Sequence, residues 1–185
     1  MRIKSLFVSL LLVGAFSLPG RLFAQARVVE PDVSFAERNL GGPRLGVTYV
    51  PGDNTLAREL QKNKFGRLLS QFGWHFEYQV IPEGGGPQFV IQLVPLISGV
   101  EYSKFLPTTT LAIGVRLPNG IEFGMGPNVM FASKVKTALT MAVGKSMNYG
   151  GVSIPINLAV TTNPEGQRVS LIIGYAIRGS ARSQW

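Results

Sequence analysis

The chain has few of the residues that most often build metal sites, disulfides and charged surfaces. Its 185 residues include no cysteine and one histidine. The missing cysteine excludes a disulfide scaffold, a thiolate-bound metal and a lipid anchor on cysteine. One histidine is too few for an ordinary zinc site, so no metal or other cofactor is expected. Charged residues make up 15% of the chain, against roughly 25% in ordinary soluble domains. Apart from one cluster between residues 58 and 67, the basic residues are scattered, which argues against nucleic acid as a partner.

The N-terminus carries an apolar run that is too short to cross a bilayer as a helix. The run covers residues 6–18 and follows Arg2 and Lys4, whereas a spanning helix needs about 20 apolar residues. Small residues at 24–26 supply a cleavage site. A positive start, a short apolar run and a small-residue cleavage site are the layout of a secretory signal peptide, so we expect residues 1–26 to direct export.

Residues 70–80 carry the clearest secondary-structure signal in the chain. They read Ser-Gln-Phe-Gly-Trp-His-Phe-Glu-Tyr-Gln-Val, with large apolar residues at the even positions from 72 onward and polar or small residues at the odd ones. Successive side chains of a strand point to opposite faces, so this alternation predicts a strand with one apolar and one polar face. Seven further strands are expected, at 43–50, 88–101, 109–117, 121–126, 135–146, 152–161 and 168–178.

Turn and cap residues place the connections between these strands. Asn119, followed by glycine, predicts a tight hairpin between the fourth and fifth strands. Asp53 or Asn54 is suited to cap one short helix after the first strand, running to about Lys64. We therefore expect a signal peptide at 1–26, a polar leader at 27–42, one β domain at 43–178 and a loose tail at 179–185.

The apolar face of these strands is too large for the interior of a small barrel. An eight-stranded barrel has an interior just wide enough to be filled by side chains, yet six strands place a large apolar group at almost every second position. The opposite face is mostly small and polar. With the apolar face turned toward lipid, this is the pattern of a transmembrane β-barrel, whose strands of about 10 residues alternate apolar and polar side chains.

The pattern over residues 43–178 resembles that of the small eight-stranded outer-membrane β-barrel proteins of Gram-negative bacteria. Residues 70–74 (Ser-Gln-Phe-Gly-Trp) and 123–128 (Phe-Gly-Met-Gly-Pro-Asn) are also similar to segments of short exported bacterial proteins of unassigned function. The resemblance implies an all-β, antiparallel up-and-down barrel in the outer membrane. It also implies that outer-membrane lipid, lipopolysaccharide included, is the partner.

A soluble exported fold is the alternative. Pro95 and Pro155 fall inside predicted strands, and proline removes a ladder donor and prefers sheet edges or bulges, which a closed barrel lacks. A periplasmic β-sandwich or lipid-binding barrel with the apolar face as its core, binding a lipid or another apolar ligand, would avoid this difficulty. It would leave an outer face with few charges, which is poor for a surface in water.

Charged residues on the polar face form the first candidate site, a polar network in the lumen. His75 beside Glu77 would also suit the general base of an outer-membrane acyl hydrolase. Ser70, however, belongs to the other face of the strand, so a hydrogen-bonding pair is the preferred interpretation. We therefore expect a structural or binding protein without catalysis. The predicted network residues are His75, Glu77, Arg116, Glu122, Lys136 and Arg178.

Basic residues around the helix form the second candidate site. Arg58, Lys62, Lys64 and Arg67 gather on or just after the predicted helix. In an even-stranded barrel with both termini in the periplasm, the first connection lies outside the cell. Lipopolysaccharide phosphates are found there, and basic side chains bind phosphate well. A solvated helix face without a partner is the plain alternative.

Overall fold

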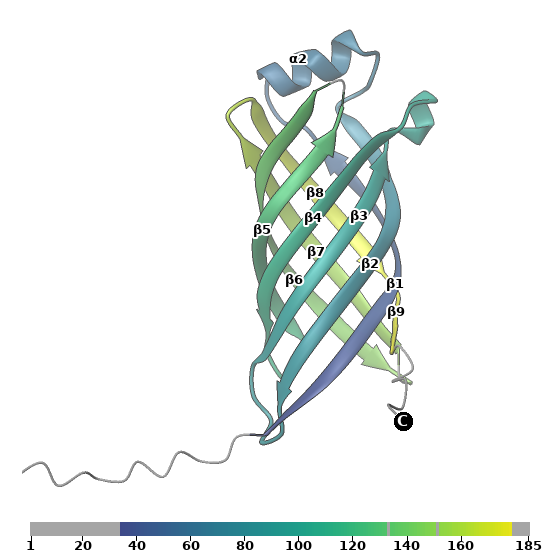
Figure 1. Cartoon of the computed structure of the whole chain (residues 1–185). Coiled ribbons are helices and arrows are strands. Elements are labelled where there is room, and N and C mark those ends of the chain that lie inside the picture. The colour runs from purple at the N-terminus through teal and green to yellow at the C-terminus, as the bar shows by residue number, and fades with distance from the viewer. Residues whose placement is uncertain (1–33, 133, 151, 179–185) are drawn as a thin grey trace, which may run out of the picture. The chain divides into compact units, whose positions relative to one another are not determined.

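The computed structural model describes residues 34–132, 134–150 and 152–178. The expected signal peptide, most of the expected leader and the expected C-terminal tail lie outside these residues. The described chain forms an antiparallel sheet that closes into a barrel, with a helix across one end (Figure 1). Its strands are β1 Phe35–Tyr49, β2 Leu68–Pro82, β3 Gln88–Ser98, β4 Leu106–Arg116, β5 Ile121–Phe131, β6 Val135–Tyr149, β7 Val152–Asn163, β8 Gly166–Gly174 and β9 Ala176–Arg178; its helices are α2 Thr55–Lys62 and the 3-10 turn η1 Val100–Tyr102.

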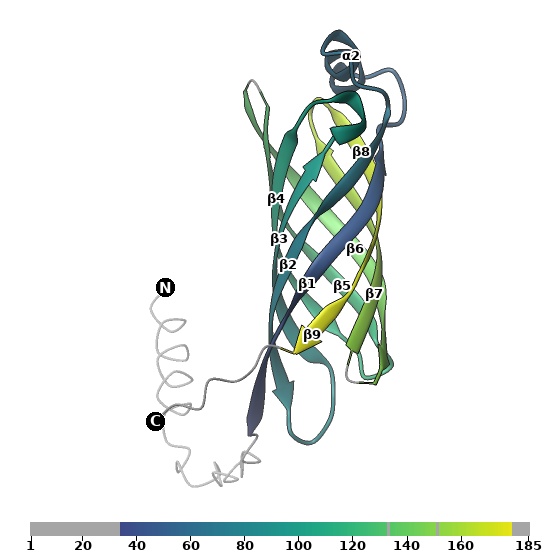
Figure 2. The same ribbon diagram turned by 90° about the vertical axis from the view of Figure 1, so that its right-hand side faces the viewer.

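The barrel has eight strands although the sheet contains nine segments. β1 pairs with β2 on one side and with β8 and β9 on the other, which closes the sheet. Arg44 pairs with Gly174 of β8 and Gly41 pairs with Ile177 of β9, so β8 and β9 are one interrupted strand in a single register. Figure 2 shows β9 beside β1, at the end of the barrel opposite α2. The predicted eight-stranded antiparallel barrel is confirmed, and its closure excludes the β-sandwich alternative.

Pro95 and Pro155, the two prolines that weighed against a closed barrel, lie beside gaps in the hydrogen-bonded ladder. The pairing of β2 with β3 is interrupted for two residues beside Pro95. The interruption between β8 and β9, at Tyr175, lies beside Pro155 of β7 and Pro43 of β1. Proline has no N–H to donate, so a ladder loses a hydrogen bond beside it. Local gaps therefore accommodate both prolines in a closed barrel, without the free sheet edge that they usually require.

Several element boundaries differ from the prediction. β1 begins at Phe35 rather than at residue 43, and all of it pairs with β2, so the expected polar leader is partly strand. Glycine, asparagine and charged residues over 35–42 have low strand propensity, which the pairing overrides. β5 continues to Phe131 for the same reason, because it pairs with β6 throughout. β3 stops at Ser98, and Gly99 then takes a left-handed φ of 84° that starts η1.

Large apolar side chains point out of the barrel and small or polar ones point in, as the alternation predicts. Leu158 is 47% exposed, whereas its neighbour Ala159 is 6% exposed. All eight strands contribute to one exposed surface, which we call the apolar belt. The belt comprises Leu45, Val47, Phe72, Trp74, Phe76, Phe89, Ile91, Leu93, Leu111, Ile113, Val115, Phe123, Met125, Leu139, Met141, Val143, Ile156, Leu158, Leu171 and Ile173.

The main apolar cluster in the interior lies under α2. Asn54 caps this helix by accepting a hydrogen bond from the Ala57 amide at 2.9 Å, which confirms one of the two predicted caps. The buried side of α2 then packs on the strand ends. We call this cluster the apolar plug; it consists of Val50, Leu56, Ala57, Leu60, Leu69, Leu106 and Met130, with Phe65 and Tyr102 packed against it.

Candidate functional site

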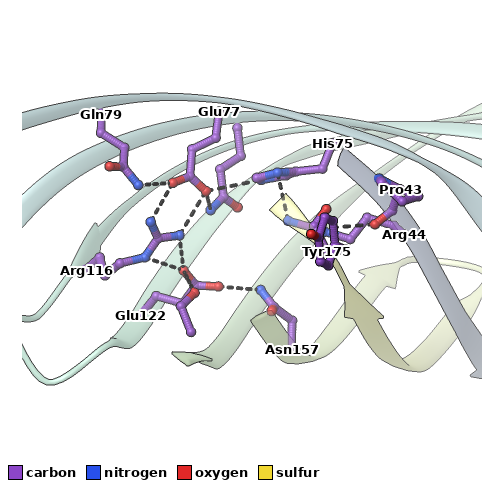
Figure 3. A network of polar contacts seen from close by, with 11 residues as sticks. Pro43, Arg44, His75, Glu77, Gln79, Arg116, Glu122, Asn157 and Tyr175 are labelled. Carbon is purple, nitrogen blue, oxygen red and sulfur yellow. Dashed lines mark hydrogen bonds and ion pairs between the residues drawn. The ribbon is translucent and has the colours of Figure 1, made fainter. Parts of the chain in front are cut away.

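Polar side chains from six strands, β1 to β5 and β7, form one hydrogen-bonded network inside the barrel. Figure 3 shows most of them from close by. Each occupies an inward position, between two residues that point outward, so the strand alternation brings them together. None of them belongs to the apolar belt. We call this group the central network; it consists of Arg44, His75, Glu77, Gln79, Gln92, Arg116, Glu122 and Asn157.

Glu77 is the centre of the network. The Arg116 guanidinium donates to both of its carboxylate oxygens, at 2.6 and 2.9 Å, in the bidentate geometry of strong ion pairs. Gln92, which pairs with Glu77 across β2 and β3, donates from Nε2 at 2.9 Å. Gln79 donates from its own Nε2 to the other oxygen. The carboxylate is therefore held by donors from three strands.

Arg116 also binds the second carboxylate. It pairs with Glu122 across the β4–β5 hairpin, and its Nε and Nη2 lie 2.8 and 2.5 Å from Glu122 Oε2. Asn157 of β7 donates to the remaining Glu122 oxygen at 2.7 Å. One guanidinium thus joins two buried carboxylates, and the network spans the width of the lumen.

His75 is neutral, as its two partners require. Arg44 Nη2 lies 2.8 Å from His75 Nδ1, and because a guanidinium only donates, Nδ1 must accept. Nε2 therefore carries the hydrogen and donates to Glu77 Oε2 at 3.2 Å. With a neutral imidazole, the two guanidinium groups of Arg44 and Arg116 balance the two carboxylates of Glu77 and Glu122. The central network is charge-neutral.

This geometry does not suit His75 to general-base catalysis. A general base needs a nitrogen that accepts the proton of a nucleophile, but Nδ1 already accepts from Arg44 and the histidine is buried. Ser70 does not approach it. The Ser70 hydroxyl donates to Glu101 instead, and the Ser70 amide donates to Glu101 Oε1 at 2.8 Å. Among the described residues no nucleophile contacts the histidine.

One predicted network residue, Lys136, lies elsewhere in the lumen, and the side chain of another, Arg178, is outside the described residues. Lys136 points inward but lies near the α2 end of β6, where its ammonium donates to Glu59 of α2 and Glu165 of the β7–β8 turn. It is the second residue of a 15-residue strand, too far along that strand to reach the central network, and strand parity alone could not reveal this. The backbone of Arg178, the last residue of β9, pairs with Leu40 of β1. The Arg178 side chain is not among the described parts of the chain. His75, Glu77, Arg116 and Glu122 are in the network.

Arg44 and Arg168 are buried charges that the sequence interpretation left out. Both occupy inward positions, beside Leu45 and Val169, so the alternation could have found them. The predicted strand that contains Arg44 is not among the six whose two faces are clearest. Arg168 was overlooked because it is the first residue of its predicted strand. It donates to Asn128 Oδ1 at 2.7 Å and lies 3.5 Å from the Met130 sulfur.

The lumen contains small cavities and a larger opening at one end. A cavity of about 70 Å³ borders Arg44 and His75, and another of about 40 Å³ borders Gln71 and Arg168. At the end opposite α2, a wider cavity of about 240 Å³ is lined mainly by polar side chains, Gln79 and Arg116 among them. The described residues include no cluster of histidine and carboxylate side chains suited to a metal ion. The inner cavities are too small for a lipid chain or a drug-sized ligand.

The predicted basic cluster lies at the closed end of the barrel. Arg58 and Lys62 are exposed on α2, and Lys64 is exposed just after it. Arg67 is half-buried, with Nη2 3.9 Å from Asp53 Oδ1. The four side chains therefore share one end of the molecule, on the solvent side of the helix whose other side forms the apolar plug. No helix in residues 34–132, 134–150 and 152–178 has the length and hydrophobicity that crossing a bilayer requires.

Comparison with known proteins shows a likeness of fold. No family model matches the sequence, and no curated protein matches it. The crystal structure of Ail, the attachment invasion locus protein of Yersinia pestis, has a TM-score of 0.50 at 9% identity, over 77% of this chain and 97% of that chain. Ail in a phospholipid bilayer nanodisc has a TM-score of 0.45 at 12% identity, over 75% of this chain and 99% of that chain. The designed protein TMB2.3 has a TM-score of 0.42 at 7% identity, over 77% of this chain and 95% of that chain. The fold predicted by resemblance is confirmed: the chain has the fold of the small eight-stranded outer-membrane β-barrels.

Proposed function

We propose that this protein is exported and inserted into the outer membrane of a Gram-negative bacterium, where it has a structural or binding role without catalysis. The apolar belt is the observation that carries the proposal. At outward positions of the described strands the charged residues are Glu37 and Lys145, both close to the end where β1 begins. A water-exposed surface is normally rich in charge, whereas a lipid-facing barrel surface carries an apolar band roughly 25 Å tall.

The filled lumen supports the membrane interpretation over a soluble carrier of lipids. A periplasmic lipid-binding barrel needs an apolar interior with room for a ligand. Here the interior holds the central network and the apolar plug, and the largest enclosed space beside His75 is about 70 Å³. The same filling argues against a water-filled pore. The proposed role therefore belongs to the surfaces of the barrel, above all to its helix-capped end.

Cell fractionation tests the location. We expect the protein in the outer-membrane fraction, soluble only with detergent, and with heat-modifiable migration on a denaturing gel, because a closed barrel keeps its shape in detergent until heated. Release by osmotic shock as a monomer that stays soluble without detergent would contradict the proposal. An esterase or lipid-deacylase activity that disappears in His75→Ala would contradict the non-catalytic role.

The partner we propose for the helix-capped end is the phosphate of lipopolysaccharide. Arg58, Lys62, Lys64 and Arg67 place several cations beside one another at the end that would face outward from the cell. Charge-assisted hydrogen bonds to phosphate are stronger than those between neutral groups. In micelles containing lipopolysaccharide, replacing all four residues by glutamine should remove most of the rise in melting temperature that lipopolysaccharide gives the wild type.

A charge change at the opposite end is the matched control for this test. Lys145→Gln also removes a cation at an outward position, but at the end away from α2. It should leave the effect of lipopolysaccharide unchanged. An equal response of the two variants, or no response of the wild type relative to phosphatidylcholine micelles, would contradict the proposed contact.

A further inference from the structure

Arg168 is a buried cation without a carboxylate partner. Its side chain is 8% exposed, and no carboxylate of the described residues lies within ion-pairing distance of its guanidinium. Its hydrogen-bond partners are the amide oxygen of Asn128 and the sulfur of Met130. The other buried guanidinium groups, of Arg44 and Arg116, belong to a network that contains two carboxylates. An uncompensated charge in a low-dielectric interior costs several kcal/mol even after relaxation.

A small cavity beside Arg168 is lined by groups that can donate hydrogen bonds. Its volume is about 40 Å³, enough for a few particles of water size. Thr108, Thr110, Thr140, Thr161 and Ser170 all line it. These hydroxyls surround a single positive charge, so the cavity carries the polarity that an anion requires.

A chain of hydrogen bonds directs one of these hydroxyls. Asn128 Oδ1 accepts from Arg168 at 2.7 Å, which fixes the orientation of the amide. Asn128 Nδ2 then donates to Thr110 Oγ1 at 2.8 Å. Because Thr110 accepts that bond, its own hydrogen is left to donate elsewhere. The guanidinium thus polarises a donor that belongs to the same cavity.

Gln71 supplies a second indication. It is buried and lines the cavity, yet its Oε1 has no hydrogen-bond partner, while its Nε2 donates to Ser98 Oγ at 3.1 Å. The oxygen and nitrogen of an amide are assigned from their partners. A serine hydroxyl both donates and accepts, so the reversed amide would accept from Ser98 equally well and would turn its NH₂ group toward the cavity. Reversal converts an unpaired acceptor into a donor for an anion.

We propose that the barrel binds one small monovalent anion, of which chloride is the physiological example, in the cavity between Arg168, Thr110 and Gln71. The anion neutralises the buried guanidinium and accepts from the donors around it. The cavity lies inside the barrel, beneath the apolar plug, so the anion enters during folding and exchanges slowly afterward. This site is independent of the proposed membrane function, because it depends only on the lumen.

Refolding with different anions tests the site. The protein is refolded in detergent at constant ionic strength with sodium chloride, sodium bromide or sodium gluconate, and the melting midpoint is measured over a range of halide concentrations. We expect a saturable rise with chloride and bromide and none with gluconate, because a ligand that binds only the folded state stabilises it in proportion to its occupancy. Crystals of protein that was refolded in bromide should show an anomalous-difference peak in the cavity beside Arg168. Equal midpoints in all three salts, or the absence of that peak, would overturn the proposal.

Variants separate this site from a general effect of salt. Arg168→Met should remove the halide dependence, and Thr110→Val and Gln71→Met should each weaken apparent halide affinity about tenfold, the effect of losing one hydrogen bond to a charged group. Gln79→Met is the matched control, since Gln79 is also buried with an unpaired Oε1 but lies in the central network. If Arg168→Met does not fold, Thr110→Val and Gln71→Met still test whether the halide binds in this cavity. A halide response of Thr110→Val and Gln71→Met equal to that of Gln79→Met would overturn the site.

The result of this test does not depend on where the protein is located in the cell. A protein found soluble in the periplasm would contradict the membrane proposal and leave the halide test intact.

Discussion

At the scale of single residues, Arg116 determines how two carboxylates can be buried in the lumen. Glu77 and Glu122 are 4% and 5% exposed, and both accept hydrogen bonds from the same guanidinium. A buried ion pair brings little net stability over an apolar substitute, but removing one partner leaves a charge that water cannot reach. The contribution of Arg116 to stability should therefore be measured by removing its side chain.

Arg116→Met tests this contribution. It leaves Glu77 and Glu122 without their shared cation, so we expect a loss of about 3–5 kcal/mol in the free energy of unfolding. Urea unfolding in detergent or lipid vesicles measures it. The exposed helix variant Arg58→Met is the control and should change stability by no more than about 0.5 kcal/mol. A small effect of Arg116→Met would mean that water from the opening beside Arg116 solvates the two carboxylates in place of the guanidinium.

Gly174 and Leu158 test the two faces of neighbouring strands. A Cβ at Gly174 would lie 2.1 Å from Arg44 Nη1, so Gly174→Leu must displace part of the central network and should cost about 1–3 kcal/mol. Leu158 lies in the apolar belt, and Leu158→Ala removes contacts with lipid without opening a cavity, so it should be tolerated. Refolding midpoints in detergent give the ranking. The reverse ranking would show that the belt is a packed core.

At the scale of elements, α2 is a cap held by an apolar plug and by ion pairs. The helix is short, and isolated helices of this length are unstable in water, so its docking must stabilise it. The Leu56 amide donates to the Glu165 carbonyl at 3.0 Å, and Lys136 bridges Glu59 of α2 and Glu165. The cap is thereby attached to two hairpins that lie far from it in sequence.

Leu60→Ala should loosen this cap without opening the barrel. The side chain is 6% exposed in the plug, and its truncation should cost about 2–5 kcal/mol through lost transfer energy and a cavity. Hydrogen exchange should accelerate in the amides of α2 and stay slow in the strands. Lys62→Ala, on the exposed side of the helix, should leave both unchanged. Faster exchange throughout the strands of Leu60→Ala would show that the cap and the barrel unfold as one unit.

Glu101 makes the contact between η1 and β2 dependent on pH. Partial desolvation raises the pKa of this carboxyl, but hydrogen bonds from the Ser70 hydroxyl and amide outweigh it and hold the pKa below its usual range. A lowered pKa means that the contact is complete above the pKa of the unfolded chain and is lost as the pH falls through the folded value. The Ser70 amide resonance should therefore titrate with a midpoint below that of an ordinary glutamate, and the titration should vanish in Glu101→Gln. A midpoint at or above the ordinary value would contradict the contact.

At the scale of the whole molecule, the alternation of apolar and polar residues predicted the strands and their two faces, and it favoured a closed barrel with the apolar face outward over a soluble fold. Period-two patterns identify strands and their faces directly, which is why Phe72, Trp74 and Phe76 were placed on the outer face and Glu77 on the inner one. The hairpin at Asn119 and the cap at Asn54 were also predictable, because turn and cap residues act locally.

What the sequence could not supply is position along the barrel axis. Parity places Lys136 and Glu77 on the same inner face, but only the register shows that they lie at different heights. The same limitation hid the partners of Arg168 and the gaps beside Pro95, since both depend on pairing with another strand. The early start of β1 likewise results from pairing with β2 along its whole length.

In the proposed membrane barrel the apolar belt contacts lipid, and spin labels on the belt test this contact directly. The chain has no cysteine, so Leu158→Cys and Ile173→Cys each provide a single site for a nitroxide spin label, and Lys62→Cys provides one on the exposed side of α2. Collisions of each label with oxygen, which concentrates in lipid, and with a water-soluble nickel chelate are measured by electron paramagnetic resonance in refolded vesicles.

The collision rates with oxygen and with the nickel chelate change in opposite directions between lipid and water. We predict that the labels at 158 and 173 collide often with oxygen and rarely with the nickel chelate, and that the label at 62 does the reverse. Frequent collision of the nickel chelate with the labels at 158 and 173 would place the belt in water. Protection of both labels from both reagents would place it in a packed core, and either result would contradict the membrane barrel.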